Sequence, residues 1–144
     1  MIVEGNDYKL YLGDCLGVMD KLIDEGIKFD AIITDPPYGT ISCKWDSVIP
    51  LNEMWDRLNK LIKDDGTIVL FGSQPFSSEL VHSNISMFRH EWIWGKDKSG
   101  NFMNCKFEPM KIHEHVLVFE KKKCTYNPIM ELREERNKRK NKPR

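Results

Sequence analysis

The sequence contains no C-x-x-C pair and no cluster of histidines, although it has four cysteines and four histidines in 144 residues. Structural zinc sites use closely spaced ligands of this kind, so we expect no metal. No apolar run approaches the roughly 20 residues of a membrane span, and the N-terminus has no apolar signal-peptide segment. We therefore expect a cytoplasmic protein in a reducing environment, with no membrane partner.

The sequence also has no net charge, because 22 basic residues balance 22 acidic ones. The charges are unevenly distributed, however. Residues 131–144 hold seven Lys or Arg and three Glu, which leaves the rest of the chain mildly acidic. Such a segment can bind nucleic acid, and it can equally be a solvated, frayed helix. We divide the chain into a body, residues 1–127, and a basic polar tail, residues 128–144.

Hydrophobic periodicity alternates between that of strands and that of helices. Apolar or alternating runs predict strands at 8–12, 29–34, 67–71, 90–94 and 113–120. Helical spacing is carried by Leu16, Met19, Leu22 and Ile23, by Met54, Leu58, Leu61 and Ile62, and by Leu80, Val81 and Ile85. This order predicts an α/β fold with a mostly parallel sheet, whose last strand returns as an antiparallel hairpin.

Several residues are expected to mark the ends and faces of these elements. Gly26 and the pair Asp65-Gly66 are natural stops for the first two helices, and Ser73 can cap the third. The strand at 29–34 is apolar on both sides, so we expect helices on both faces of it. Trp92 and Trp94 share one face of their strand, which favours the core over a surface platform.

Polar residues collect where the predicted strands end. They are Asp14, the run Asp35-Pro36-Pro37-Tyr38, Ser73-Gln74 and Gly95-Lys96. In parallel α/β sheets ligands bind beyond the carboxyl ends of the strands. These residues therefore define the expected site.

The run Asp35-Pro36-Pro37-Tyr38 has the groups needed to bind an aromatic amine. The Asp35 carboxylate and the carbonyl of Pro36 can both accept from an exocyclic NH₂, because the prolines fix φ and donate no N–H of their own. Tyr38 offers a ring for stacking. Two acceptors would make the amine nitrogen more tetrahedral and its lone pair more nucleophilic, and Asp35 could take the released proton. The alternative is an ordinary turn from strand to loop.

The same four residues, "DPPY", resemble the catalytic motif of the amino-methyltransferases that modify adenine or cytosine in DNA. The similarity extends from about Tyr8 to Pro128, through "LYLGDCLGVM", "DGTIVLFGSQPF", "WIWGKDKSGNF" and "MKIHEHVLVFEKKKCTYNP". It implies a partial Rossmann-like class I methyltransferase sheet, double-stranded DNA as substrate and S-adenosyl-L-methionine as cofactor. Asp14 and Asp35 would contact this cofactor. An initial Asp is more typical of adenine N6 enzymes, with cytosine N4 as the alternative.

One family feature is missing from the sequence. The family binds the methionine end of its cofactor with a glycine-rich turn, but none of the nine glycines here forms G-x-G. The resemblance therefore suggests the catalytic half of a permuted enzyme, completed by a missing C-terminal half or a second polypeptide. A non-catalytic DNA-binding remnant is the alternative. We expect the strand that ends near Asp14 to have an exposed edge.

Further residues are candidates for DNA contact through their position. They are Trp45, which follows the catalytic segment, Gln74 at a strand end, and Lys96, Lys98, Asn101 and Phe102 in the loop before the last strand. For Trp45 and Gln74, packing and helix capping are equally ordinary roles.

Overall fold

The computed structural model describes residues 1–40, 43 and 46–130. Its main sheet has the strand order β3-β4-β6-β5. β3 (Phe29–Thr34) runs parallel to β4 (Ile62–Gly72), and β6 (His113–Glu120) is antiparallel both to β4 and to β5 (Phe88–Gly95). β3, β4 and β5 therefore point the same way and β6 returns between two of them. The predicted α/β fold, mostly parallel with an antiparallel last strand, is confirmed.

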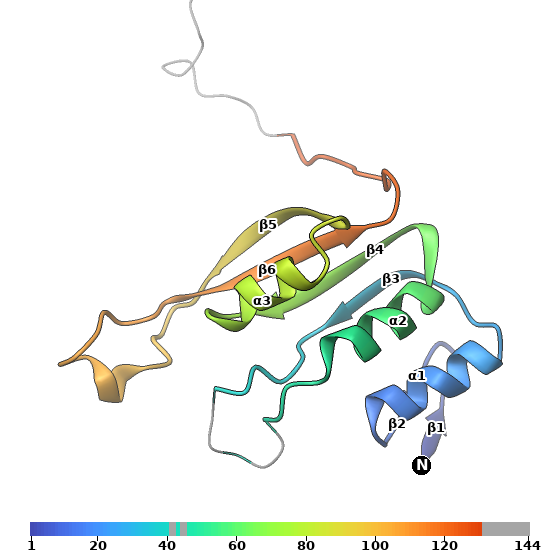
Figure 1. Ribbon diagram of the computed structural model, residues 1–144, viewed down its shortest axis with the longest axis horizontal. Coiled ribbons are helices and arrows are strands. Elements are labelled where there is room, and N and C mark those ends of the chain that lie inside the picture. Colours follow the sequence, from blue (N-terminus) through green and yellow to red (C-terminus); the bar gives the residue numbers. More distant parts are fainter. Residues whose placement is uncertain (41–42, 44–45, 131–144) are drawn as a thin grey trace, which may run out of the picture.

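The helices cover one face of this sheet. α1 (Cys15–Asp24), α2 (Leu51–Leu61) and α3 (Phe76–Ser83) lie on the same side in Figure 1. α2 and α3 pack on alternate residues of the central strands, so Ile68 and Leu70 of β4 and Leu117 of β6 are fully buried. This burial forms the core that supports the strand ends. None of the helices in the described part of the chain has the length and apolar character to span a bilayer.

The helix ends follow local chemistry, with three corrections to the sequence analysis. The Asp14 carboxylate caps α1 by accepting from the Gly17 N–H at 3.1 Å, and Gly26 follows the helix with a φ of 71°. α2 ends at Leu61 rather than at Asp65-Gly66, because Ile62 already has extended backbone and pairs with β3. α3 is preceded by Pro75 without a side-chain cap, so Ser73 does not have the expected role.

The third correction concerns the last apolar residue predicted to face the core from α3. Ile85 lies beyond the end of the helix and is 65% exposed, whereas Leu80 is fully buried. The helix stops at Ser83, two residues before Ile85, so Ile85 is not held against the sheet.

The other face of the sheet is open, contrary to the expectation for the strand at 29–34. The register places Ile33 beside Val69 and Trp92 beside Val116 on this face. Ile33 is 67% exposed, and Trp92 and Trp94 are about half exposed. The two tryptophans do share a face, as predicted, but in the described residues no helix covers it. We refer to Ile33, Val69, Phe71, Trp92, Trp94 and Val116 as the open face.

The N-terminal strands form a separate ribbon. β1 (Ile2–Glu4) pairs antiparallel with β2 (Lys9–Tyr11), and neither joins the main sheet. The predicted strand at 8–12 is therefore real but does not begin the parallel sheet, because Ile2–Glu4 offers it a nearer partner across a short turn. Among the described residues β2 pairs on one side only, as expected for the strand that ends near Asp14, and the edge strands of the main sheet are β3 and β5.

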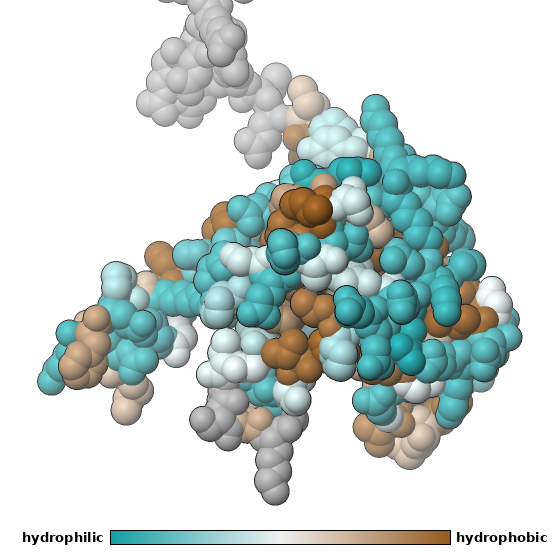
Figure 2. All heavy atoms as spheres, in the orientation of Figure 1, coloured by the Kyte–Doolittle hydropathy of each residue, from teal (hydrophilic) through white to brown (hydrophobic). Residues whose placement is uncertain are grey.

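A long arm connects β5 to β6 and stands away from the body in Figure 1. It contains the short 3₁₀ helix η1 (Phe102–Asn104). Figure 2 shows apolar residues at this arm, whereas hydrophilic ones cover much of the side that carries α1 and α2. Phe102, Met103 and Phe107 are each more than two-thirds exposed.

Candidate functional site

The four-residue run predicted to carry chemistry lies directly after β3, at the carboxyl end of the parallel pair. Pro36 is buried, whereas Asp35 remains exposed at the surface. The Tyr38 hydroxyl donates to Oδ1 of Asp35 at 2.6 Å. The carboxylate therefore faces outward from the sheet, with one oxygen oriented by the tyrosine.

Tyr38 is held in place by an aromatic neighbour. Its ring stacks on Phe76, the first residue of α3, with a centroid distance of 5.3 Å and an interplanar angle of 26°. Burial raises the pKa of Tyr38, and the hydrogen bond to Asp35 raises it further. The hydroxyl therefore stays protonated at neutral pH and acts as a donor to Asp35.

The backbone after the prolines is held by a second carboxylate. Oδ1 of Asp46 accepts from the N–H of Tyr38 at 2.9 Å and from that of Gly39 at 3.0 Å. Gly39 has a φ of 69°, a conformation that residues with a side chain disfavour. Asp46 is only 8% exposed.

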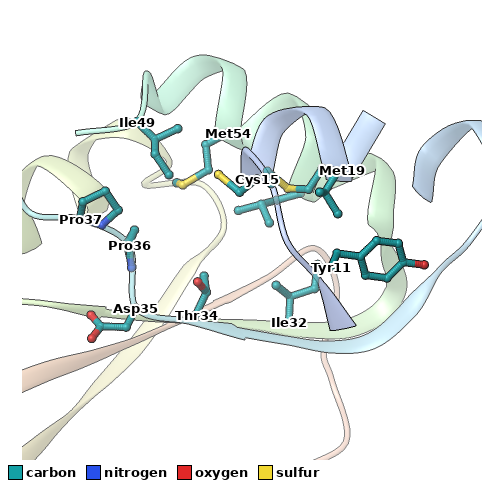
Figure 3. Close-up of a pocket in the computed structure, with 13 residues that line it drawn as sticks. Tyr11, Cys15, Met19, Ile32, Thr34, Asp35, Pro36, Pro37, Ile49 and Met54 are labelled. Atoms are coloured by element: carbon teal, nitrogen blue, oxygen red, sulfur yellow. The ribbon is translucent and has the colours of Figure 1, made fainter. Parts of the chain in front are cut away.

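Two cavities meet at residues 35–38, which the sequence predicts to be catalytic and which we call the catalytic segment. The first has a volume of about 390 Å³, lies between β3 and the helices, and is mainly apolar. In Figure 3, Met54, Cys15 and Met19 lie across it from Ile32, Thr34 and Pro36, and the Asp35 carboxylate points away from them. We call it the apolar cavity.

The second cavity, of about 300 Å³, lies on the other side of the same segment. We call it the polar cavity, because three carboxylate residues are among those that line it. The lining residues are Asp35, Pro36, Pro37, Tyr38, Thr40, Asp46 and Glu114. Asp35, Pro36 and Pro37 line both cavities, so the segment forms a wall between an apolar compartment and a polar one.

Asp14 lies near the apolar cavity without lining it. Its neighbours Gly13 and Cys15 are lining residues, while one of its own oxygens caps α1. Because the other carboxylate oxygen is free of that capping bond and Asp14 is exposed, a role toward a ligand stays a prediction.

The DNA candidates are dispersed by the structure. Trp45 is outside the described residues. The Gln74 side chain accepts from Ser78 in α3 and lines a different cavity. Lys96 forms an ion pair with Glu114 and lies 5.1 Å from the Trp94 ring centroid. The structure thus brings Lys96, through Glu114, to the polar cavity, but not Gln74.

Asn101 and Phe102 both lie in the arm. Asn101 forms hydrogen bonds within the arm, whereas the Phe102 side chain is exposed. The Asn101 amide is used within the arm: it accepts from Lys111 N–H at 2.6 Å and donates to Glu108 and to the carbonyl of Pro109, both at 3.1 Å. The bond from Asn101 to Glu108, with a second one from Asn104, lowers the pKa of Glu108. Phe102 is 69% exposed beside them. Contact of either residue with DNA stays a prediction.

The sequence analysis missed Phe76, Asp46 and Glu114, which complete the surroundings of Asp35 and Tyr38. None of these three lies in a periodic pattern that points to the strand end. Phe76 is the one of the three that the sequence could have suggested. It directly follows Pro75, shortly after the end of β4, and an aromatic residue at such a place can pack on the end of the neighbouring strand. Asp46 contacts the site from seven or eight residues further along the chain, and Glu114 is brought there by long-range packing.

Comparison with known proteins identifies the class. The chain matches the family model N6_N4_Mtase, a DNA methylase, over residues 29–144. Because this match spans most of the sequence, the protein belongs to that family of DNA methylases, and the resemblance read from "DPPY" is confirmed. No curated protein matches the chain.

Two solved structures share the fold. The M1.HpyAVI–SAM complex matches with a TM-score of 0.65 and 23% identity, and the structure of M1.HpyAVI matches with a TM-score of 0.63 and 22% identity. Each match covers 86% of this chain and 62% of the other. The chain thus spans 62% of the length of these structures, and at this identity the likeness establishes the fold.

Proposed function

We propose that the protein contributes the catalytic half of an S-adenosylmethionine-dependent methyltransferase that modifies the exocyclic N6 of adenine in double-stranded DNA. One observation carries the proposal: Asp35, Pro36 and Pro37 form the wall between an apolar and a polar cavity. A transferase must bring a donor and an acceptor to one point from two sides, and this wall offers such a point.

The apolar cavity suits the cofactor. Its volume of about 390 Å³ lies in the usual range for small-molecule pockets, and its side chains can enclose an adenine ring or a methylthio group. The residues that would hold the group are Ile32, Ile49, Met19 and Pro36, with Asp35 at the edge. S-adenosylmethionine supplies an electrophilic methyl group when bound. The cofactor of M1.HpyAVI, a structure of the same fold, supports this assignment.

The polar cavity suits a base that has left the duplex. Flipping a base costs a few kcal/mol of stacking and pairing. In the polar cavity the free face of Tyr38 can stack on the base, since Phe76 covers the other face. Oδ2 of Asp35 and the carbonyl of Pro36 accept from the amine, because Oδ1 already accepts from Tyr38. The amine nitrogen would take the methyl group as the bond from that group to the donor sulfur breaks and the sulfonium becomes a neutral thioether. Asp35 would accept the proton that the nitrogen releases.

The choice of adenine rests on the initial Asp of the motif, and cytosine N4 is the alternative. The test is methyl transfer from labelled S-adenosylmethionine to DNA by the complete enzyme, that is, the full chain with the glycine-rich segment that completes it, followed by nucleoside mass spectrometry. We expect N6-methyladenine, and at least about 10²-fold slower turnover for Asp35→Ala. The matched control is Asp24→Ala, an exposed carboxylate on α1 that lines neither cavity. N4-methylcytosine as the product would show that cytosine, and not adenine, is the substrate base. Undiminished turnover of Asp35→Ala would remove Asp35 from the mechanism.

We further propose that a polypeptide segment with the glycine-rich turn covers the open face and the free edge of β3. This surface holds Ile33, Trp92 and Trp94, all at least half exposed, which is costly for a soluble protein. The sequence has no G-x-G turn of its own for the methionine end of the cofactor. The segment can be continuous with this chain or a separate polypeptide.

A photo-crosslinking residue in place of Ile33 tests this partner, with the same residue at Asp24 as control. We expect the Ile33 probe, and not the Asp24 probe, to capture a peptide that contains a glycine-rich turn. Capture of a second copy of residues 1–130 would overturn the proposal. A chain that binds DNA yet neither captures such a segment nor transfers methyl groups would be the non-catalytic remnant.

A further inference from the structure

We infer that Asp46 is a positioning residue that fixes the catalytic segment through its backbone. Residues 35–39 have an unusual hydrogen-bonding requirement. Pro36 and Pro37 have no N–H, so the first donors after Asp35 are the N–H groups of Tyr38 and Gly39. Tyr38 is partly buried, and unpaired donors at such a place are unfavourable. Some acceptor must therefore be brought to the segment from elsewhere.

Asp46 supplies this acceptor with a single oxygen. Oδ1 receives both N–H groups, at 2.9 and 3.0 Å, from a residue that is 8% exposed. Two successive N–H groups that converge on one anion form a concavity of the kind called a nest. Asp46 is itself held, since its N–H donates to the carbonyl of Cys43 at 3.0 Å. We call this arrangement the Asp46 clamp.

The Asp46 clamp acts on chemistry indirectly. It fixes the backbone of Tyr38, whose ring lies on Phe76 and whose hydroxyl orients Oδ1 of Asp35. A displacement of the Tyr38 backbone would therefore shift both the stacking face and the carboxylate that receives the amine. Asp46 lines the polar cavity, but the oxygen that forms the clamp is used by the backbone. We therefore assign it positioning and not proton transfer.

The negative charge of Asp46 and its acceptor oxygen make different contributions to the Asp46 clamp, and two substitutions separate them. Asp46→Asn keeps an oxygen at the Oδ1 position but removes the charge that strengthens both bonds. Asp46→Ala removes the acceptor altogether. If Asp46 positions the segment, the asparagine variant should retain most of the function that the alanine variant loses. Asp24→Ala serves again as the matched exposed carboxylate.

The first readout does not depend on activity. In the wild-type chain, the Tyr38 and Gly39 amide protons should exchange slowly with solvent. We expect exchange at least about tenfold faster in Asp46→Ala and an intermediate rate in Asp46→Asn. Equal exchange rates in all three proteins would overturn the inference. If the alanine variant fails to fold, the asparagine variant still decides, because loss of charge alone should speed exchange.

The second readout rests on the proposed function. In methyl transfer to DNA, we expect Asp46→Ala to lower kcat by about 10- to 100-fold while KM changes by less than about threefold, with Asp46→Asn closer to wild type. Fast amide exchange combined with an unchanged kcat would make Asp46 a structural residue only. Absence of transfer by the wild-type complete enzyme, with its glycine-rich segment, would instead count against the proposed function, while the exchange data would still decide whether the clamp exists.

Discussion

Replacing Gly39 with alanine should destabilise the protein by two separable effects. The first is conformational, because a φ of 69° costs a residue with a Cβ about 1–2 kcal/mol. The second is steric, because the new Cβ would lie 2.7 Å from Cγ2 of Val48. Val48 is 38% exposed and can rotate away, so we expect this contact to cost only about 0.5–1.5 kcal/mol. Urea unfolding with linear extrapolation measures the sum.

The chain offers a control for the conformational effect alone. Gly26 has nearly the same φ, 71°, but a Cβ there would meet no atom within 4 Å. The entropy lost from the unfolded chain on Gly→Ala substitution is common to both sites and cancels in their difference. Gly39→Ala should therefore cost more than Gly26→Ala by about the contact energy. Adding Val48→Ala to Gly39→Ala should remove only that excess.

A result in which Gly39→Ala is as stable as the wild type would refute the reasoning about this turn. Full recovery of stability by Val48→Ala would refute the conformational part of it. Gly100→Ala, at a position with open space around it and no positive φ, should change stability by less than about 0.5 kcal/mol.

Three further predictions concern the core, a surface link and pH. Leu80→Ala should lower the free energy of unfolding by about 2–5 kcal/mol, since Leu80 is fully buried against the sheet; a loss below about 1 kcal/mol would contradict this packing. Arg57→Ala should lower the free energy of unfolding by less than Leu80→Ala does, because its paired bonds to Asp20 of α1 are partly solvated, and added salt should shrink the difference. The raised pKa of Tyr38 means that above about pH 10 the unfolded chain releases a proton that the folded one keeps, so stability should fall there with rising pH. Tyr38→Phe should decline less steeply over the same range in a pH series of urea unfolding, and parallel curves would contradict the buried hydrogen bond.

The sheet could be predicted because its evidence is local. Ile32, Ile68 and Leu70 belong to short apolar runs whose length and period are typical of buried strands, and the helices between them have clear apolar faces. The motif at Asp35 was equally visible, since its residues are consecutive. Each of these signals lies within a dozen residues of sequence.

The features that the sequence analysis did not predict lack such a local signal. A two-sided apolar strand indicates that both faces will be covered, but it does not identify the segment that covers them, so Ile33 was expected to be buried and lies on the open face. β1 is only three residues long, too short for a periodic signal. Asp46 reaches Tyr38 through a bend in the loop, and no spacing rule connects a carboxylate to N–H groups seven or eight residues earlier.

The site shows what the chemistry of individual residues can predict and what it cannot. The sequence indicated that Asp35 and Tyr38 would cooperate, but not that the hydroxyl of one donates to the carboxylate of the other. It also predicted DNA contact for Asn101, which stays a prediction, but it did not indicate that the amide of Asn101 is engaged within the arm. Polar side chains in loops have many possible partners, and only the folded arrangement selects among them.

Binding of S-adenosylmethionine to the apolar cavity is the most direct test of the account, and the methionines make it measurable. Met19 and Met54 line that cavity, whereas Met103 and Met130 are more than four-fifths exposed and lie outside it. In a chain labelled with ¹³C at the methionine methyl groups, titration with the cofactor should shift the Met19 and Met54 resonances saturably and leave the other two unchanged. Saturable shifts confined to Met103 or Met130, or no shift at any methionine, would contradict a donor site on this side of Asp35.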